Sequence, residues 1–378
     1  MIKTIGALTI FLSCCLSLVA QSERKVISFK QVAVSAEAFE TAEVFDVDND
    51  SIPDIVSGSY WYKGPDFRLM YLMSHQRRWY GDYYDDFSTI PFDVNEDGKM
   101  DFITGGWWGA TLRWMENPGK DSIWAEHTIA KTGNIETTRA WDIDGDGVPE
   151  IISNNPGHPL LIYKKEKGKP SFTGYKVADK QGHGLGFGDI NGDGRGDLII
   201  SDGWLEAPAD RFNGSWKLHK ELNLGATSVP IIVADVNKDG LNDLIVGQGH
   251  DYGLHWYEQK MEKKQRKWIK HEIDPFNSQF HALMWVDIDN DGKDELITGK
   301  RYRAHNERDP GSYDPIGLFY YKWNGESFTK EVIAYGPLGQ GKGTGIYFAV
   351  HDLDGNGWKD IVVPGKDGLS IFFNQGNQ

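Results

Sequence analysis

The chain has 378 residues, of which 39% are hydrophobic and 25% charged, and its formal net charge at pH 7 is -15. The sequence has no basic stripe of the kind that would suggest a nucleic-acid partner. The only two cysteines, Cys14 and Cys15, lie in the first twenty residues, so no disulfide can form within the rest of the chain.

The first twenty residues have the features of a secretory signal. A lysine and an apolar stretch, residues 3–19, are followed by Ala20 and polar Gln21. The stretch is short for a membrane span, and no other apolar segment is long enough to be one. We therefore expect residues 1–20 to be a signal peptide and residues 21–378 to form one exported domain, periplasmic or extracellular. Lipid attachment at a cysteine is the less favoured alternative, because the preceding residues fit that motif poorly.

An acidic nonapeptide then recurs seven times, with glycine at position 6 in six of the copies. The copies are Asp46–Asp54, Asp93–Asp101, Asp142–Glu150, Asp189–Asp197, Asp235–Asp243, Asp287–Glu295 and Asp352–Asp360. Calcium takes six to eight oxygen ligands and favours a glycine where its loop turns sharply. An EF-hand has its last acid at position 12 of a loop between helices, whereas here it is at position 9 and a strand-like run follows. The pattern predicts calcium-binding turns between strands.

The predicted calcium ligands are the side chains at positions 1, 3, 5 and 9: Asp46, Asp48, Asp50, Asp54, Asp93, Asn95, Asp97, Asp101, Asp142, Asp144, Asp146, Glu150, Asp189, Asn191, Asp193, Asp197, Asp235, Asn237, Asp239, Asp243, Asp287, Asp289, Asp291, Glu295, Asp352, Asp354, Asn356 and Asp360. They include 24 of the 55 acidic residues, so we interpret the acidity as structural. Ser51 takes the glycine position in the first copy, where we expect the weakest metal.

The copies begin 46 to 65 residues apart, the spacing of one propeller blade per repeat. Each unit contains four strand-like runs, which predicts an all-β, seven-bladed β-propeller. The last unit ends at its third strand, and Ser28–Val34 is similar to the outer strand Ser327–Ile333. We therefore expect the N-terminal strand to complete the last blade and close the ring.

The face opposite the acidic loops carries most of the residues suited to chemistry. His183, His250 and His281 are candidate metal ligands or proton-transfer groups, since imidazole does both. His305 and Tyr302 are candidates for acid/base catalysis, and the long segment 300–315 that contains them has the length of a functional loop. The candidate substrate clamps are Lys300, Arg301 and Arg303, and the candidate sugar platform is Trp107, Trp108 and Trp204. By contrast His127, His219 and His271 recur at one outer-strand position and are interpreted as structural.

The acidic loops resemble the FG-GAP/VCBS repeats of integrin-type propellers. A narrower likeness lies in GHGLGFGDINGDGRGDLIISDGW, GQGHDYGLHWYEQ, SQFHALMWVDIDNDG and TGKRYRAHNERDPGSYDP. These segments resemble the propeller domain of aldos-2-ulose dehydratase and its secreted bacterial relatives. The resemblance implies removal of water from keto-sugars by β-elimination at a metal-containing site. The isomerase portion of the fungal enzyme has no counterpart here.

Two functions follow as alternatives. One is a carbohydrate lyase or dehydratase acting on a keto-sugar or keto-glycoside, with structural calcium and a zinc-like divalent metal at the histidines. The other is a non-catalytic propeller that binds glycans or protein partners on the same rim. Convergence of His183, His250, His281 and His305 on one point would favour the enzyme. The oligomeric state is left open.

Overall fold

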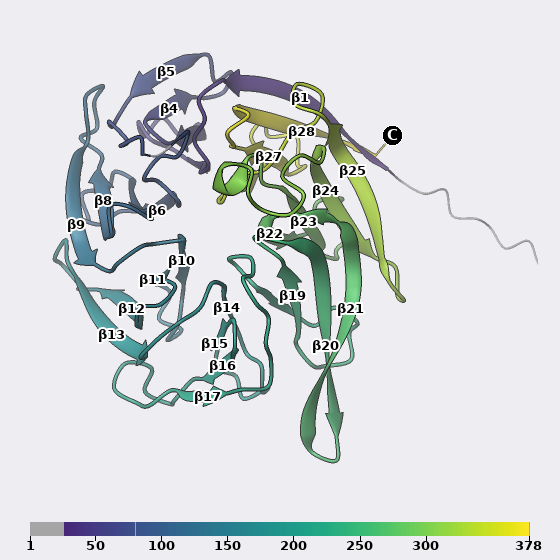
Figure 1. Cartoon of the computed structure of the whole chain (residues 1–378). Helices are drawn as coiled ribbons and strands as arrows, with labels where there is room; N and C mark the ends of the chain where they lie inside the picture. The colour runs from purple at the N-terminus through teal and green to yellow at the C-terminus, as the bar shows by residue number, and fades with distance from the viewer. Residues whose placement is uncertain (1–25, 80, 378) are drawn as a thin grey trace, which may run out of the picture.

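The computed structural model describes residues 26–79 and 81–377, and the predicted signal peptide lies outside them. Seven four-stranded antiparallel sheets form a ring (Figure 1). In six of them the strands follow sequence order from the centre outward, and in the seventh the outermost strand is β1. Blades 1 to 4 contain β2 (Glu43–Phe45), β3 (Asp54–Ser57), β4 (Tyr60–Lys63), β5 (Leu69–Leu72); β6 (Ile90–Phe92), β7 (Asp101–Gly105), β8 (Thr111–Glu116), β9 (Ala125–Lys131); β10 (Thr137–Trp141), β11 (Glu150–Asn154), β12 (Leu160–Lys165), β13 (Phe172–Ala178); and β14 (Leu185–Gly188), β15 (Asp197–Ile200), β16 (Gly203–Glu206), β17 (Lys217–His219).

Blades 5 to 7 contain β18 (Ile232–Ala234), β19 (Asp243–Gly247), β20 (Tyr252–Glu262), β21 (Gln265–Ser278); β22 (Phe280–Val286), β23 (Glu295–Lys300), β24 (Ile316–Trp323), β25 (Phe328–Gly336); and β26 (Ala349–His351), β27 (Asp360–Val363), β28 (Leu369–Asn377), β1 (Ile27–Ser35). A single short 3-10 helix, η1 (Ala304–Asn306), occurs in the described residues. Among these residues, no helix has the length and apolar character needed to cross a membrane. The predicted all-β, seven-bladed propeller is confirmed.

The two ends of the chain close the ring. Strand β1 pairs antiparallel with β28, in a register that sets Val32 against Ile371. Figure 1 shows β1, in purple, lying beside the yellow β28. The predicted closure by Ser28–Val34 is confirmed, with the strand one residue longer at each end. The last sheet therefore has four strands like the others, and the outer edge of β28 is paired with β1 rather than exposed.

The hydrophobic core lies between adjacent blades. The second strand of every blade is buried along its whole length. One core cluster joins Ile245 and Leu254 of blade 5 to Leu296 and Phe319 of blade 6. Because each blade buries its faces against its neighbours, the sheets depend on one another for a core.

All seven acidic loops join the first and second strands of their blades and therefore lie on one face of the ring. Position 6 has φ between 81° and 87° in the six glycine loops and φ 67° at Ser51. This left-handed conformation is freely accessible to glycine and costs other residues free energy. The carboxylate at position 1 accepts the backbone N–H groups of positions 5 and 6, as Asp46 does from Asp50 and Ser51.

The acid at position 9 has a structural role that the sequence pattern did not reveal. Asp54 accepts the N–H of Val47 at 2.9 Å and that of Gly64 at 2.8 Å, which ties the loop to the third strand. The equivalent pair of bonds recurs in four other blades, at Asp101, Asp197, Asp243 and Asp360. These acids are buried, so the loops have hydrogen-bonded anchors in addition to any metal.

Candidate functional site

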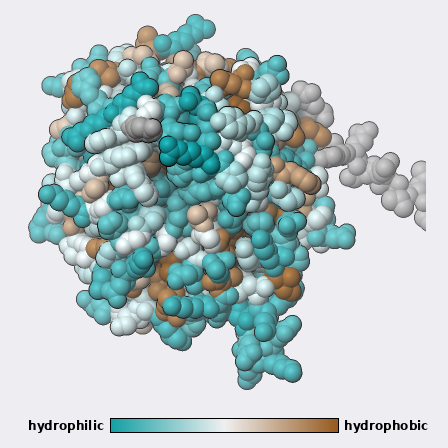
Figure 2. Space-filling model, in the orientation of Figure 1, coloured by the Kyte–Doolittle hydropathy of each residue, from teal (hydrophilic) through white to brown (hydrophobic). Residues whose placement is uncertain are grey.

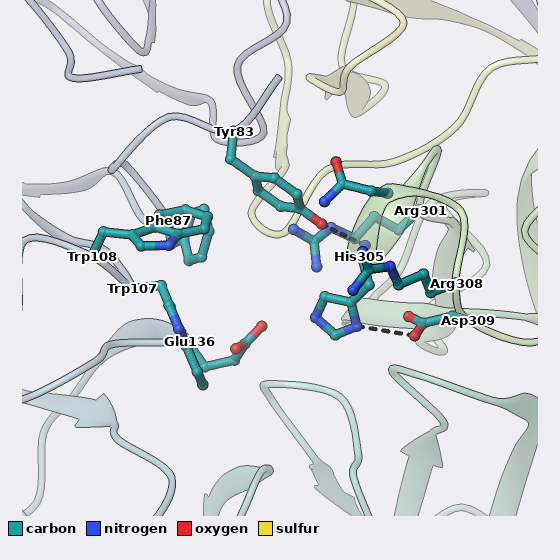
Figure 3. Close-up of a pocket in the computed structure, with 10 residues that line it drawn as sticks. Tyr83, Phe87, Trp107, Trp108, Glu136, Arg301, His305, Arg308 and Asp309 are labelled. Carbon is teal, nitrogen blue, oxygen red and sulfur yellow. Dashed lines mark hydrogen bonds and ion pairs between the residues drawn. The ribbon is translucent and has the colours of Figure 1, made fainter. Parts of the chain in front are cut away.

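A cavity of about 390 Å³ lies on the face opposite the acidic loops. Figure 3 shows Phe87, Trp107 and Trp108 on one side of the cavity, with Glu136 beside Trp107, and Arg301, His305, Arg308 and Asp309 on the other. Its lining residues are Tyr83, Phe87, Trp107, Trp108, Glu136, Arg301, His305, Asn306, Arg308 and Asp309. In the orientation of Figure 1, the space-filling view is mainly hydrophilic with apolar residues scattered singly (Figure 2). Four of the residues that line the cavity, Tyr83, Phe87, Trp107 and Trp108, are aromatic.

Three histidines that do not themselves line the cavity converge on Glu136, which does. His183 precedes β14, His250 lies between β19 and β20, His281 is on β22, and Glu136 directly precedes β10. The Nε2 atoms of His183 and His250 are 2.8 Å apart. Oε1 of Glu136 lies 3.4 Å from Nε2 of His183 and 2.8 Å from Nε2 of His281. One ligand atom from each of the four residues lies within 4.8 Å of the others.

These separations match the ligand sphere of a single metal ion. Metal–nitrogen bonds of about 2.0–2.1 Å place neighbouring ligand atoms roughly 2.9–3.4 Å apart in tetrahedral or octahedral geometry. The loops approach closely because glycines flank the histidines. Gly184 has φ 126°, and a Cβ there would come within 1.9 Å of Oγ1 of Thr227. The predicted convergence of His183, His250 and His281 is therefore present in the structure.

The hydrogen bonds of the other ring nitrogens define the tautomers. Nδ1 of His183 lies 2.8 Å from the carbonyl oxygen of Thr227, and Nδ1 of His250 lies 3.1 Å from Oδ2 of Asp309. A carbonyl or ionised carboxylate can only accept, so both Nδ1 atoms carry protons. In the neutral rings, each Nε2 then presents a lone pair. Two lone pairs face each other beside a carboxylate, an arrangement that a cation stabilises.

Burial favours the neutral form of two of the clustered histidines. It lowers the pKa of His281 to about 3 and also lowers the pKa of His250. Burial alone would raise the pKa of Glu136, but His183 and His281 outweigh it when they are protonated and hold this pKa well below its usual value. Neutral imidazoles and an ionised carboxylate are the forms that bind a metal. Within the described structure, neither ring nitrogen of the fully buried His281 has a hydrogen-bond partner of good geometry.

His305 extends this cluster toward the cavity. Its ring stacks on that of His250, with centroids 4.3 Å apart and planes 12° apart. Nδ1 of His305 lies 3.0 Å from Oδ1 of Asp309, whose other oxygen faces His250. Burial opposes ionisation of Asp309, but the two histidines outweigh it and lower its pKa. Asp309 thus orients both the ring of His250, in the cluster, and the ring of His305, which is half exposed.

The aromatic wall is centred on Trp108. Its ring centroid lies 5.2 Å from that of Tyr83 and 5.9 Å from that of Phe87. Asp85 holds the platform in place by accepting the backbone N–H of Trp108 at 3.0 Å and that of Gly109 at 2.9 Å. Trp107 also lines the cavity. Two of the three predicted platform residues are therefore at the site.

Several other predicted site residues lie elsewhere or have structural roles. Trp204 is 1% exposed and stacks on His219 in blade 4, so it is a core residue. The ammonium of Lys300 bonds the carbonyl oxygens of Gly311 and Asp314 and thereby holds the long loop. Arg301 lines the cavity, but it is 1% exposed and its guanidinium is bound by Glu40.

Two more candidates lie outside the cavity lining. Tyr302 is only partly buried. Arg303 pairs with Glu307 at 2.9 Å and with Asp82 at 3.4 Å. Neither side chain is among the residues that line the cavity.

The site also contains residues that the sequence did not single out. Glu136, Tyr83, Phe87, Arg308 and Asp309 line the cavity. Glu136 had one available signal: like Glu40, it directly precedes a threonine close to the start of the innermost strand of its blade. That position faces the channel mouth in a propeller. The outer-strand histidines behave as predicted, since His127 and His219 pair with Glu116 and Glu206 at 2.7 Å.

Some of the predicted calcium ligands lie close together within their own acidic loop, and calcium binding itself stays a prediction. In blades 1, 3 and 6 the carboxylates at positions 1, 3 and 5 bring oxygens within 4.8 Å of one another. These groups are largely exposed on the face opposite the cavity.

A scan against protein-family models matches the FG-GAP-like repeat over residues 93–153, 142–200 and 213–298, which together cover more than half of the chain. No curated protein matches. Among solved structures, a lectin of Agrocybe aegerita described as recognising non-reducing terminal N-acetylglucosamine is similar, with 15% identity, a TM-score of 0.45 and 81% of each chain covered. The V. cholerae biofilm matrix protein Bap1 is also similar, with 16% identity and a TM-score of 0.38, over 86% of this chain and 45% of that one. The chain is therefore a member of the FG-GAP-like repeat family, built as a seven-bladed β-propeller.

Proposed function

We propose that this protein is an exported carbohydrate lyase or dehydratase that uses a divalent metal to carry out β-elimination on a keto-sugar or keto-glycoside. The observation that carries the proposal is the convergence of the ring nitrogens of His183, His250 and His281 on Glu136. These four groups lie beside a cavity with an aromatic wall. A fold alone does not assign an activity, so the site is the basis of the proposal.

The four residues would hold a zinc-like ion. Such an ion supplies a Lewis acid that stabilises negative charge on a carbonyl oxygen. Imidazole and carboxylate ligands suit zinc and neighbouring transition metals. Nδ1 contacts to Thr227 and Asp309 provide the outer hydrogen bonds that orient such ligands.

The remaining residues have the chemistry that an elimination requires. The proton on the carbon next to a carbonyl is acidic, and His305 can accept it at Nε2 because Asp309 holds Nδ1. The electron pair released from this C–H bond forms a C=C bond as the β C–O bond breaks. The leaving oxygen takes a proton from an acid and departs as water or an alcohol. Burial raises the pKa of Tyr83 to about 12, so its hydroxyl keeps a proton for this step.

The aromatic wall suits the substrate class. The apolar faces of sugar rings pack on aromatic rings, and Trp108 and Trp107 present such surfaces in the cavity. Arg308 adds a positive group for substrate oxygens. A volume of about 390 Å³ is within the range of small-molecule sites.

The acidic loops support a separate structural proposal, in which calcium neutralises carboxylates on the opposite face. Positions 1, 3 and 5 lie on one turn and carry side-chain oxygens in every copy, and oxygen is the ligand type that calcium prefers. Removing the ion should lower stability without touching the cavity. Chelation by EGTA should therefore lower the melting temperature.

The alternative function is glycan binding without catalysis, which the aromatic wall also favours. The two functions differ in their need for the histidines. A binder gains its affinity from aromatic rings and hydrogen bonds, whereas elimination needs the metal ligands. Replacement of a ligand should abolish elimination but leave glycan binding largely intact.

The test measures enone absorbance in the near ultraviolet after incubation with 1,5-anhydrofructose or 3-keto-glucosides, with zinc, manganese or nickel supplied. We expect turnover by the wild type and loss of about a thousandfold or more in His250→Ala, with metal content measured on the same samples. His158→Ala is the matched control, because His158 lies on the same face outside the cluster. Absence of product across the panel from metal-loaded wild type would overturn the lyase proposal. Glycan binding that is unchanged in His250→Ala would then favour the binder.

A further inference from the structure

One position on the third strand of each blade faces the acidic loop. Strand pairing defines it. The residue that directly follows the position-9 acid lies on the second strand and pairs with a residue of the third strand. The position meant here is the residue that follows this partner on the third strand. In blade 3, for example, Ile151 pairs with Tyr163, and Lys164 follows. We call this the loop-facing position. In blades 1 to 7 it is occupied by Lys63, Glu116, Lys164, Glu206, Glu258, Lys322 and Phe373.

The three lysines at this position reach into the acidic loops. The ammonium of Lys164 lies 2.6 Å from Asp144, 2.8 Å from Asp146 and 2.9 Å from Glu150. Lys322 contacts Asp289, Asp291 and Glu295 of blade 6 in the same manner. Lys63 contacts Asp48 and Asp50 of blade 1. Each ammonium therefore lies among the oxygens at positions 3 and 5 that a divalent cation would need.

The three glutamates have a different set of partners. Glu116, Glu206 and Glu258 accept hydrogen bonds from His127, His219 and His271 of the outer strand, at 2.7, 2.7 and 3.0 Å. Two of them also accept from the asparagine at position 3, since Asn95 donates to Glu116 and Asn237 to Glu258. Other cations near these loops, Lys99, Arg195 and Lys260, contact only the position-5 carboxylate of the loop.

The residue at the loop-facing position varies with the residues at positions 3 and 5 of the loop. Where both are Asp, in blades 1, 3 and 6, the facing residue is Lys. Where position 3 is Asn, in blades 2, 4 and 5, the facing residue is Glu. Blade 7 has Asn at position 5 instead and the uncharged Phe373. Counted over positions 1, 3, 5 and 9 and the facing residue, the formal charge is therefore -3 or -4 in every blade.

We infer that in blades 1, 3 and 6 the lysine ammonium is the resident cation of the acidic loop and takes the place of calcium. An ammonium within 2.6–2.8 Å of the position-3 and position-5 oxygens fills the space of an ion whose own oxygen contacts are 2.3–2.6 Å. The positive charges of lysine and calcium would also repel each other at this range. These three loops therefore do not fit calcium, although their Asp-x-Asp-x-Asp pattern resembles a calcium loop most closely. The calcium proposal is restricted to the other four blades.

The test counts bound calcium and measures stability in a chelator. We expect wild-type protein, dialysed against calcium and analysed by mass spectrometry of the native protein and by elemental analysis, to bind at most four calcium ions. Lys164→Met should raise the count by one, because four carboxylates lose their internal counter-ion. The melting temperature of this variant should fall in EGTA relative to the wild type and recover when calcium is added. The matched control is Lys165→Met, since Lys165 is the next residue and its ammonium contacts Glu96 rather than the blade 3 loop.

The outcomes separate clearly. Seven calcium ions in the wild type would overturn the inference, as would a Lys164→Met variant with an unchanged count and unchanged sensitivity to EGTA. A double change, Asp144→Asn with Lys164→Glu, converts blade 3 to the arrangement of blades 2, 4 and 5 and guards against a single variant that fails to fold. It should fold and gain chelator sensitivity. Failure of the keto-sugar assay would leave this inference unaffected, because the loops and the cavity lie on opposite faces.

Discussion

The buried pair between Arg301 and Glu40 provides the sharpest stability prediction. Nε and Nη2 of Arg301 lie 2.6 and 2.9 Å from the two oxygens of Glu40, a bidentate geometry. The side chains are 1% and 4% exposed. The pair joins the start of the long loop in blade 6 to the segment before the first strand of blade 1, and so holds one wall of the cavity.

We predict that Glu40→Gln destabilises the protein by about 3–5 kcal/mol, the cost of leaving one charge of a buried pair uncompensated. Arg301→Met should cost about 3 kcal/mol, at the lower end of that range, because Lys366 remains 3.8 Å from Glu40. Replacing both partners removes both buried charges. The double variant should therefore cost less than the sum of the single changes, with a coupling of about 2 kcal/mol.

The pair also predicts a pH dependence. Burial would raise the pKa of Glu40, but Arg301 and Lys366 outweigh it and hold this pKa below its usual value of 4.5. A carboxyl whose pKa is lowered in the folded state stabilises the fold above its unfolded pKa, and the stabilisation is lost as pH falls through the folded pKa. Glu40→Gln should lack this part of the acid sensitivity.

The assay is urea unfolding of the wild type, both single variants and the double variant, followed by tryptophan fluorescence and circular dichroism, and repeated at low pH. Glu37→Gln is the control, because Glu37 lies on the same segment and is only partly buried. Single changes that cost less than about 1 kcal/mol, or costs that simply add, would refute the reasoning.

Two further predictions concern the metal cluster and ring closure. Asp309→Asn should weaken metal affinity about 10–100-fold, the usual effect of losing an outer hydrogen bond to a ligand, as measured by competition with a chromophoric chelator. Asp314→Asn, on the same loop, should leave the affinity unchanged. Equal affinities in both variants would show that Asp309 does not orient His250. Deletion of residues 27–35 removes β1 and exposes the edge of β28. The variant should therefore melt at a clearly lower temperature in calorimetry and associate at high concentration. An unchanged melting temperature would contradict closure by this strand.

The repeat architecture was readable from the sequence because its signals are local. Each acidic turn, its glycine and the strand that follows lie within about a dozen residues, so blade number and strand order follow from spacing alone. Closure by the N-terminal segment was also predictable, since the last blade lacked a strand that this segment resembles. The convergence of His183, His250 and His281 followed from counting which loops share a face.

Other features depended on side-chain direction and on contacts between distant blades. Trp204 occupies the same third-strand position as Trp114 and Trp256, and strand register turns all three toward the core. Lys300 and Arg301 carry charges suited to a substrate, yet their partners are a loop carbonyl and Glu40, the latter 261 residues away in sequence.

The sequence by itself determined the ring, its closure and the face that carries the histidines, because these follow from repeating local chemistry. Only the tertiary structure decided that Glu136 completes the histidine cluster, that Asp309 links it to His305, and that lysines enter three of the acidic loops. The physical reason is that each of these contacts joins residues from different strands or blades, whose meeting depends on strand register and on how neighbouring sheets pack.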